Sequence, residues 1–352
     1  MKRRAFLKAA AVAVSTAARP CSLEAAQADP SPAKLPRWRG FNLLEKFIYS
    51  KNGNGPFQES DFELMAQWGF DFVRLPMDYR CWTEDAAATE FKEETLKHID
   101  QAVAWGKQYK IHVNLNFHRA PGYCVNPPKE ALNLWEDPKA QEQFSRHWAF
   151  FADRYKGLPS RQISFDLVNE PAGTENAKYA AVVEKAVRAI RAVDPARLII
   201  ADGNQWGTKP VPEIAHLKVG QSTRGYQPFQ LTHYKAGWVG GSDRWPEPTW
   251  PLGDYDAAKH WREQVEPWKQ LEAKGVGVHV GEWGAFSHTP HKVVLAWMKD
   301  MLENWRKAGW GWSLWNLRGA FGVLDSGRKD VAYEEVKGRK LDKAMLEILR
   351  AG

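Results

Sequence analysis

The sequence is poor in cysteine, with three in 352 residues, and their spacing indicates no metal site. Neither a Cys-x-x-Cys pair nor a series of Cys and His residues with zinc-ligand spacing occurs, so we expect no bound metal. Cys21 lies in a segment that we expect to be removed, which leaves Cys81 and Cys124. A disulfide between these two and a pair of buried free thiols fit the sequence equally well.

Long apolar runs are also missing. The apolar stretch near the N-terminus, rich in Ala and Val, is about ten residues long, too short and too weakly apolar for a membrane span. The first expected strand continues as GFNLLEKF, which is no glycine-rich phosphate-binding turn, so a nucleotide-dependent α/β enzyme is disfavoured. No internal repeat and no second domain is visible in the sequence.

The excess of positive charge is small once the N-terminal segment is set aside. The formal net charge is +7, but residues 1–28 hold five basic residues and one acidic residue. The remainder is therefore near +3. That balance indicates neither nucleic acid nor, once the signal is removed, an anionic membrane surface as a partner.

The N-terminus has the pattern of an export signal of the twin-arginine type. Arg3-Arg4 and the following Phe-Leu-Lys precede the Ala/Val-rich stretch, and Ala-Gln-Ala at 26–28 offers a small-residue cleavage site. We expect export to the periplasm or beyond. The expected organisation is a signal peptide over 1–28, a proline-rich linker over 29–37 and one domain over 38–352.

Tryptophan is abundant, with 18 residues, or about 5% of the chain. A buried indole N–H needs a hydrogen-bond partner, so a core alone rarely calls for so many. We assign about half of them to the core. A flat apolar face with a polar edge also suits a sugar ring, which makes the rest candidates for carbohydrate contacts.

Strand-like and helix-like segments alternate along the chain. Strict alternation of this kind predicts a parallel sheet with crossover helices, and eight units in this length favour a closed (β/α)8 TIM barrel over an open doubly wound sheet. The expected strands are 39–44, 70–76, 110–118, 163–169, 197–202, 229–234, 275–283 and 309–315. The expected helices are 59–69, 94–109, 139–155, 177–193, 255–274, 291–308 and 341–350.

Side-chain alternation within the strands indicates which residues face the barrel interior. In 110–118 the apolar residues share one face and should meet the helices, while the polar residues, ending at His118, share the other. In 163–170, Glu170 lies on the inward face with Asp166. In 276–282, Glu282 shares its face with three valines.

Two carboxylic acids fall at expected strand ends, on the fourth and the seventh strand. The active site of a βα barrel lies at the C-terminal ends of its strands. Two carboxyl groups there suit cleavage of a glycosidic bond, in which one protonates the leaving oxygen and the other attacks the sugar or activates water. Arg74 and His233 could keep one carboxylate ionised. The residues at these strand ends are Arg74, His118, Asn169, Glu170, His233, Glu282 and Trp315.

An ordered series of short motifs resembles glycoside hydrolase family 5 across the whole expected domain. The motifs are VRLP (73–76), FHRAPG (117–122), LVNEP (167–171), THY (232–234), VGEWG (280–284) and GWSLWN (311–316). The resemblance implies a retaining mechanism with Glu170 as acid/base and Glu282 as nucleophile, whose carboxyl groups would lie about 5–5.5 Å apart. It also implies supporting roles for Arg74, His118, Asn169, His233 and Trp315.

One motif departs from the family pattern. The family commonly shows His-x-Tyr on the sixth strand, with the tyrosine hydrogen-bonded to the nucleophile. Here the tyrosine of the expected motif directly follows the histidine, as His233-Tyr234. The strand alternation would then point Tyr234 away from the site, which puts its supporting role in question.

The expected partner is a β-linked polysaccharide, bound by a monomer without a cofactor. Trp206, Trp238, Trp245 and Trp250 lie in long loops and are candidates for stacking platforms. Endo-β-1,4-glucanase is the leading activity because it is the commonest in the family, and β-mannanase and exo-β-1,3-glucanase stay open. A non-catalytic carbohydrate-binding barrel is the alternative of another class, and it should have lost one of the two acids.

Overall fold

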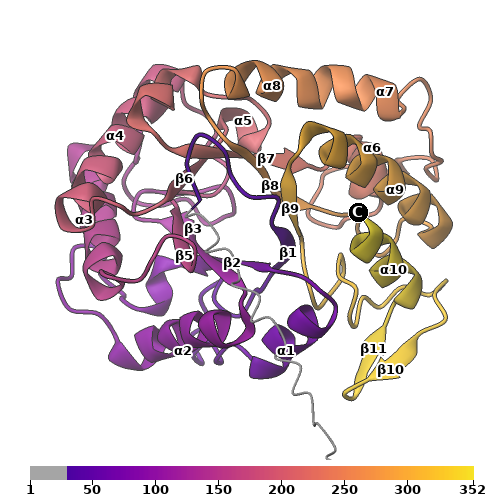
Figure 1. Ribbon diagram of the computed structural model, residues 1–352, viewed down its shortest axis with the longest axis horizontal. Helices are drawn as coiled ribbons and strands as arrows, with labels where there is room; N and C mark the ends of the chain where they lie inside the picture. The colour runs from indigo at the N-terminus through magenta and orange to yellow at the C-terminus, as the bar shows by residue number, and fades with distance from the viewer. Residues whose placement is uncertain (1–29) are drawn as a thin grey trace, which may run out of the picture.

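The computed structural model describes residues 30–352 and has a closed barrel of eight parallel strands at its centre (Figure 1). The strands follow one another around the barrel in chain order, and pairing of β2 with β3 and of β1 with β9 completes the ring. The expected TIM barrel is confirmed. Its strands are β1 (Arg39–Asn42), β2 (Phe72–Asp78), β3 (His112–Ala120), β5 (Ile163–Asp166), β6 (Ile199–Asp202), β7 (Gly220–Gly225), β8 (Val278–Trp283) and β9 (Gly311–Leu314).

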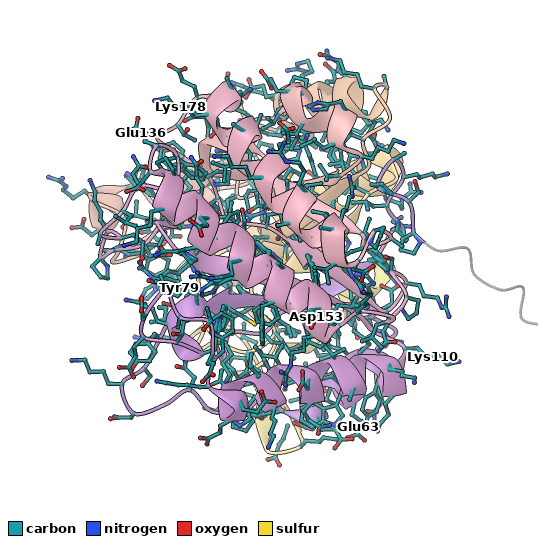
Figure 2. All side chains as sticks on the ribbon, turned by 90° about the vertical axis from the view of Figure 1, so that its left-hand side faces the viewer. Glu63, Tyr79, Lys110, Glu136, Asp153 and Lys178 are labelled. Atoms are coloured by element: carbon teal, nitrogen blue, oxygen red, sulfur yellow. The ribbon has the colours of Figure 1, made fainter. Side chains whose placement is uncertain are left out.

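Helices surround the barrel, and Figure 2 looks onto three neighbours among them, α2, α3 and α4. Near the first residues of α3 and α4, Lys178 of α4 forms an ion pair of 2.7 Å with Glu136, which lies just before α3. The helices are α1 (Glu59–Gln67), α2 (Glu93–Tyr109), α3 (Pro138–Arg154), α4 (Asn176–Val193), α5 (Asn204–Gly207), α6 (Phe229–Thr232), α7 (Ala257–His260), α8 (Glu266–Glu272), α9 (His291–Ala308) and α10 (Lys343–Ala351).

Shorter elements complete the described chain. A 3₁₀ helix, Pro212–Leu217, takes the place of a full helix between β6 and β7. The two-residue strand β4 (Tyr123–Cys124) pairs antiparallel with the end of β3, and β10 (Glu334–Val336) forms a hairpin with β11 (Arg339–Leu341). Between α7 and α8 the chain forms one π-helical segment, Trp261–Val265.

The sixth strand is not where the sequence placed it. Residues 229–234 were expected to form it, but Phe229–Thr232 is the short helix α6 and the strand is β7, nine residues earlier in the chain. Its sequence GQSTRG is polar and begins and ends with glycine. Gly225 is required because Trp305 packs on it, where an added Cβ would lie 2.6 Å from the indole, and Leu35 packs closely on Gly220.

The described part of segment 29–37 is not a linker, contrary to expectation. Leu35 is buried against the N-terminal ends of the strands beside Trp38, the residue directly after the segment, whose ring is stacked 3.8 Å from that of His112. The Gly277 N–H donates to the carbonyl of Pro32 at 2.7 Å. The segment therefore covers the bottom of the barrel and belongs to the folded domain, because removing it would expose these apolar side chains.

The side-chain alternation predicted for β3 is confirmed. Phe117 stacks on Trp148 of α3 with ring centroids 4.0 Å apart. On the opposite face, His112 and Asn114 both hydrogen-bond the Ser164 hydroxyl across the interior, at 2.7 and 2.8 Å. The barrel thus has an apolar outer layer under the helices and a polar inner layer.

Three further findings concern the sequence-based expectations. Cys81 and Cys124 are both free thiols. The predicted signal peptide, 1–28, lies outside the described residues. Within 30–352, none of the helices is both long and apolar enough for a transmembrane span.

Buried histidines in the interior make the fold sensitive to acid. Burial lowers the pKa of His112 and of His279 to about 3, so both rings stay neutral in the folded protein. Both His279 nitrogens lack a hydrogen-bond partner among the described residues. In the unfolded chain these rings take up protons below the ordinary pKa of about 6.5. Stability is therefore lost as the pH falls from there toward the folded-state pKa.

We predict that His279→Leu weakens this dependence. The variant removes one proton uptake on unfolding, so the unfolding free energy should fall less steeply on acidification, by about 1.4 kcal/mol per pH unit. Urea titrations at several pH values between about 7 and 5 measure the slope. His216 is exposed, so His216→Leu is the control, and this variant should keep the wild-type slope. Equal slopes in wild type and His279→Leu would contradict the account.

Candidate active site

The two predicted catalytic acids meet at the C-terminal mouth of the barrel. Glu170 follows β5 and Glu282 lies near the end of β8, and their side chains are 16% and 5% exposed. Arg224 Nε donates to Glu170 Oε1 at 3.0 Å, while Arg224 Nη2 lies 3.5 Å from Glu282 Oε1. One guanidinium therefore contacts both carboxyl groups.

Glu170 reaches the site because β5, and with it the regular alternation of side chains, ends before this residue. β5 ends at Asp166, after which the backbone turns and both Asn169 and Glu170 point to the site. Glu170 has φ = 49°, a left-handed conformation uncommon for a non-glycine residue. Its N–H donates to Asp202 Oδ2 at 2.9 Å and its carbonyl accepts from Tyr123 at 2.6 Å. These contacts fix a strained residue at a functional position.

A β-bulge orients Glu282. The register between β8 and its neighbours shifts after Val280, so that Glu282 pairs with Arg224 and no longer follows the valines. Gly281 is the residue at the shift, and an added Cβ there would lie 2.3 Å from Ser222 Oγ and 2.9 Å from Arg224 Nη1. Only glycine allows this close approach, which is typical of bulges beside active sites.

Arg74 anchors the nucleophile candidate from the opposite side. It is buried, and its Nη1 donates to Glu282 Oε1 at 2.6 Å. Its Nε donates to Asp166 Oδ2 at 2.8 Å and its Nη2 to Asn169 Oδ1 at 2.9 Å. Because β1 and β2 are neighbours, Asn42 accepts a further bond from Nη1 at 3.1 Å and fixes the guanidinium plane.

Tyr226, rather than Tyr234, is the tyrosine that contacts Glu282. Its hydroxyl donates to Glu282 Oε2 at 3.1 Å. Burial and the nearby carboxylate raise the pKa of Tyr226 well above its ordinary value, so it stays a donor. Tyr234 is buried elsewhere, with the Lys235 ammonium 5.0 Å from its ring. The expected supporting contact of Tyr234 is therefore corrected, and the error follows from misplacing the sixth strand.

His233 does not neutralise a carboxylate either. Its Nδ1 lies 2.9 Å from the Thr232 hydroxyl, and its ring stacks on Phe229 at 4.0 Å. Burial lowers the pKa of His233 to about 4, so the ring is neutral near pH 7. Its closest approach to the site is an edge contact with the Tyr226 ring, 5.2 Å between centroids.

Two residues that the sequence analysis did not single out carry much of the electrostatics: Arg224 and Asp202. Arg224 Nη1 donates to Asp202 Oδ1 at 3.1 Å, and Nη2 bonds the other Asp202 oxygen. Asp202 ends an expected strand, which was a usable signal. Arg224 had none, because its strand was not recognised.

The buried cluster contains more carboxyl groups than cations. Arg74 and Arg224 face Asp166, Asp202, Glu170 and Glu282. Four ionised carboxylates would leave a net negative charge out of water, which is costly. Burial first, and then the charge of Glu282, raises the pKa of Glu170 to about 7. Burial and Asp202 raise the pKa of Asp166 similarly.

His118, Trp315 and Asn169 line the same mouth. The His118 and Trp315 rings lie roughly parallel with centroids 5.9 Å apart, and burial lowers the pKa of His118 to about 3. Asn169 Oδ1 accepts from both arginines at 2.9 Å, which leaves its Nδ2 buried without a partner among the described residues. A buried amide donor without a partner is available to a ligand hydroxyl.

Exposed aromatic side chains lie around the mouth. Trp206 and Trp238 are 54% and 61% exposed, while ten of the 18 tryptophans are buried. The backbone N–H of Trp206 donates to the carbonyl of Pro171, next to Glu170, at 3.1 Å. Trp238 packs edge-on against Phe286, with centroids 4.8 Å apart. Trp245 and Trp250 are only half-buried, and Trp250 donates to Asp300 at 2.8 Å.

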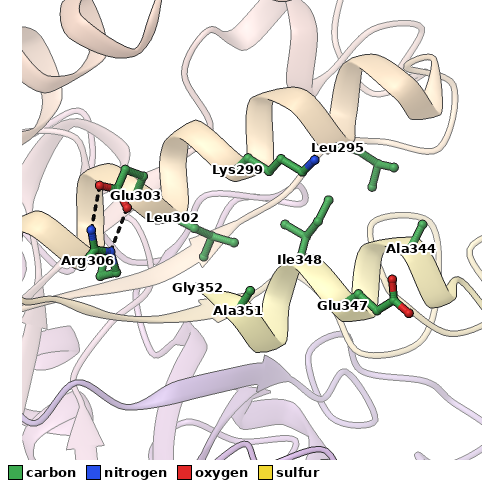
Figure 3. Close-up of a pocket in the computed structure, with 10 residues that line it drawn as sticks. All are labelled: Leu295, Lys299, Leu302, Glu303, Arg306, Ala344, Glu347, Ile348, Ala351 and Gly352. Carbon is green, nitrogen blue, oxygen red and sulfur yellow. Dashed lines mark hydrogen bonds and ion pairs between the residues drawn. The ribbon is translucent and has the colours of Figure 1, made fainter.

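A second hollow, between α9 and α10, is separate from this mouth (Figure 3). It has a volume of about 520 Å³, and its walls combine Leu295, Leu302 and Ile348 with the ion pair of Glu303 and Arg306. None of the barrel-mouth residues lines it. Within residues 30–352 no group of His, Cys, Asp and Glu side chains is arranged to hold a metal ion.

Comparison with known proteins finds relatives among glycoside hydrolases over most of the chain. The chain is 28% identical over 320 residues to endoglucanase C of Acetivibrio thermocellus, covering 82% of this chain and 92% of that protein. A solved glycoside hydrolase is 39% identical and superimposes with a TM-score of 0.85, covering 90% of this chain and 99% of its own. Endoglucanase Cel5A of Thermotoga maritima is 25% identical, with a TM-score of 0.74 and coverage of 89% and 96%.

The fold and the paired carboxyl groups define a glycoside hydrolase. The family model of cellulases, glycosyl hydrolase family 5, matches residues 27–320. The chain belongs to that family.

We predict that Tyr226→Phe slows hydrolysis whereas Tyr234→Phe does not. Loss of the bond to Glu282 removes one charge-assisted interaction, and kcat should fall about tenfold or more. Both variants lose a single oxygen, so they are matched. Steady-state kinetics on a soluble β-glucan, with unfolding curves for both, measures the effect. A larger loss in Tyr234→Phe would contradict the assignment.

Proposed function

We propose that this protein is a retaining endo-β-1,4-glucanase in which Glu282 is the nucleophile and Glu170 the acid/base. The observation that supports this most strongly is the placement of two largely buried carboxyl groups, from β8 and from the segment after β5, on one guanidinium. The retaining course is the one that the family implies, and it requires the two carboxyl groups to lie about 5–5.5 Å apart.

The first step requires an ionised Glu282 and a protonated Glu170. Arg74, Arg224 and Tyr226 each direct a donor or a positive charge at Glu282. Glu282 attacks the anomeric carbon, the glycosidic C–O bond breaks, and Glu170 gives its proton to the leaving oxygen. The raised pKa of Glu170, about 7, supports its starting as the acid.

The second step reverses the role of Glu170. As a carboxylate it takes a proton from water, the water oxygen bonds to the anomeric carbon, and the bond to Glu282 breaks. The product keeps the β configuration. The free Asn169 Nδ2 is suited to the hydroxyl beside the anomeric carbon, and the indole of Trp315 provides an apolar surface beside it.

The substrate assignment rests on the relatives and on the aromatic side chains. Proteins named endoglucanases align over most of the chain, which favours β-1,4-glucan over β-mannan and β-1,3-glucan. Trp206 and Trp238 are exposed, Trp206 beside Pro171 and Trp238 beside His233, and we propose that they contact sugar rings of the substrate. The alternative, a non-catalytic carbohydrate-binding barrel, does not need both acids.

Export and a monomeric state complete the proposal. The Arg3-Arg4 pattern supports a twin-arginine-type signal over residues 1–28, so the enzyme would act outside the cytoplasm on a polymer. We propose a monomer with no cofactor, because the residues needed for the chemistry all come from one chain.

The test of the proposal is release of reducing sugar from three soluble polymers: β-1,4-glucan, galactomannan and β-1,3-glucan. Wild type should act best on β-1,4-glucan. Glu170→Ala and Glu282→Ala should each lose at least about a thousandfold in kcat, because each removes a group that acts in both steps. Azide should restore activity to Glu282→Ala with an inverted product. Wild-type binding without release would favour the carbohydrate-binding barrel, and unimpaired variants would refute the assigned roles.

A second test addresses the aromatic platforms. Trp206→Ala should weaken kcat/KM on the polymer about tenfold, because a sugar ring on the leaving-group side loses its stacking surface. Hydrolysis of an aryl β-cellobioside, which has no sugar on that side, should be nearly unchanged. The comparison of the two substrates is its own control for folding. An equal loss on both substrates would contradict the placement of Trp206.

A further inference from the structure

The sixth strand departs from the pattern of the family in a residue that contacts both acids. With Tyr226 as the tyrosine of the motif, the position two residues before it is Arg224, where the family pattern His-x-Tyr has histidine. Arginine and histidine are not equivalent here. A guanidinium keeps its positive charge at any working pH and offers five donors, whereas a buried imidazole is neutral and offers one.

The Arg224 guanidinium uses all three nitrogens within the site. Nε donates to Glu170, Nη2 donates to Asn169 Oδ1 at 2.9 Å and lies 3.5 Å from Glu282. Nη1 donates to the Ser222 hydroxyl at 3.1 Å. The side chain is only 1% exposed, so these interactions are not weakened by water.

The position of Arg224 is fixed from two sides. Asp202 holds it in a two-pronged ion pair, and the Asp202 side chain is completely buried. The aliphatic part of Arg224 packs on Gly207, where an added Cβ would lie 2.7 Å from Arg224 Cγ. Asp202 also accepts the Glu170 N–H. The Asp202 carboxylate thereby fixes both the Arg224 side chain and the backbone of Glu170, the proposed acid/base.

We propose that Arg224 is a positioning residue of the reaction, which holds Glu170 and Glu282 on one guanidinium and sets the pH range in which the pair is active. The inference rests on the proposed function and extends it. In place of the neutral histidine of the family pattern, this chain has a permanent charge between its two catalytic carboxyl groups.

The direction of the pH effect follows from the charges. Burial and Glu282 raise the pKa of Glu170, and Arg224 opposes them. Without Arg224 the pKa of Glu170 should rise, so the acid would stay protonated to higher pH and the basic limb of the kcat/KM profile would move upward. The other charged and titratable groups that face this pair are Arg74, Asp166, Asp202, Tyr123, Tyr226, His118 and His279.

The same charge has a role after the covalent intermediate forms. Glu282 then carries an ester and no negative charge, so the carboxylates that remain in contact with Arg224 are Glu170 and Asp202. This favours the carboxylate form of Glu170, which is the form that must take a proton from water. A neutral histidine would supply no such bias.

The experiment compares Arg224→Gln, Arg224→Lys and Arg224→His by full pH profiles on an aryl β-cellobioside. Arg224→Gln should lose roughly tenfold to a hundredfold in kcat and move the basic limb upward by about one pH unit. Arg224→Lys keeps the charge but loses the fork, so kcat should fall while the limbs stay in place. The basic limb of the pH profile of Arg224→His should move upward as it does in Arg224→Gln.

The outcomes separate this proposal from a merely structural role. Circular dichroism and thermal unfolding identify the folded variants. A folded Arg224→Gln with lower kcat and unmoved limbs would overturn the proposal. If Arg224→Gln fails to fold, Arg224→Lys provides the test. A wild-type kcat in Arg224→Lys would show that the forked geometry of the guanidinium is not needed to position the acids. Failure of the proposed function is distinct, since wild type would then release no product at all.

Discussion

Two buried guanidinium groups surrounded by four carboxyl groups are the constraint on which the rest of the site depends. Arg74 and Arg224 come from strands on opposite sides of the barrel mouth, and both bond Asn169 Oδ1 between them. Removing such charges from water is costly unless each has close partners. The excess of carboxyl groups means that protons must be retained within the cluster, which supplies an acid beside a carboxylate.

The barrel is built to hold this cluster in place. Above an apolar cluster at the bottom of the barrel, its inner layer is polar, with His112 and Asn114 both hydrogen-bonded to Ser164. Its outer layer is packed with indoles, and the Trp283 ring lies edge-on against Trp305 at 4.7 Å. The same bulge that places Trp283 in the outer layer turns Glu282 inward. The bulge in β8 thus determines both the packing of the outer layer and the orientation of the nucleophile.

Much of the architecture could be predicted from the sequence. Seven of the eight barrel strands were recognised from apolar segments, six of them followed by an expected helix, and the strand-end rule grouped Arg74, Asn169, Glu170 and Glu282 at one end of the barrel. β7 could not be found in this way, because GQSTRG has neither an apolar run nor β-branched alternation. Its small residues are explained only by bulky neighbours from distant parts of the chain, such as Leu35 and Trp305. Missing that strand also hid Arg224 and Tyr226.

Strand alternation was reliable within strands and failed where they end. β5 stops at Asp166, three residues before Asn169, and β8 contains a bulge before Glu282. Both irregularities lie at the site, where bent backbone directs catalytic groups inward. The proline-rich segment ahead of β1 misled for a different reason. Its composition is that of a linker, but Leu35 and Trp38 cover the open end of the barrel.

The central claim is that Glu282 forms a covalent bond to the sugar while Glu170 handles the proton. The most direct measurement is trapping with a 2-deoxy-2-fluoro-β-cellobioside, followed by proteolysis and mass spectrometry of the labelled peptide. The account predicts one label per protein molecule, on the carboxyl of Glu282, with slow release of product of retained configuration. A label on Glu170, or turnover of cellulose oligomers to an inverted product without any label, would contradict it.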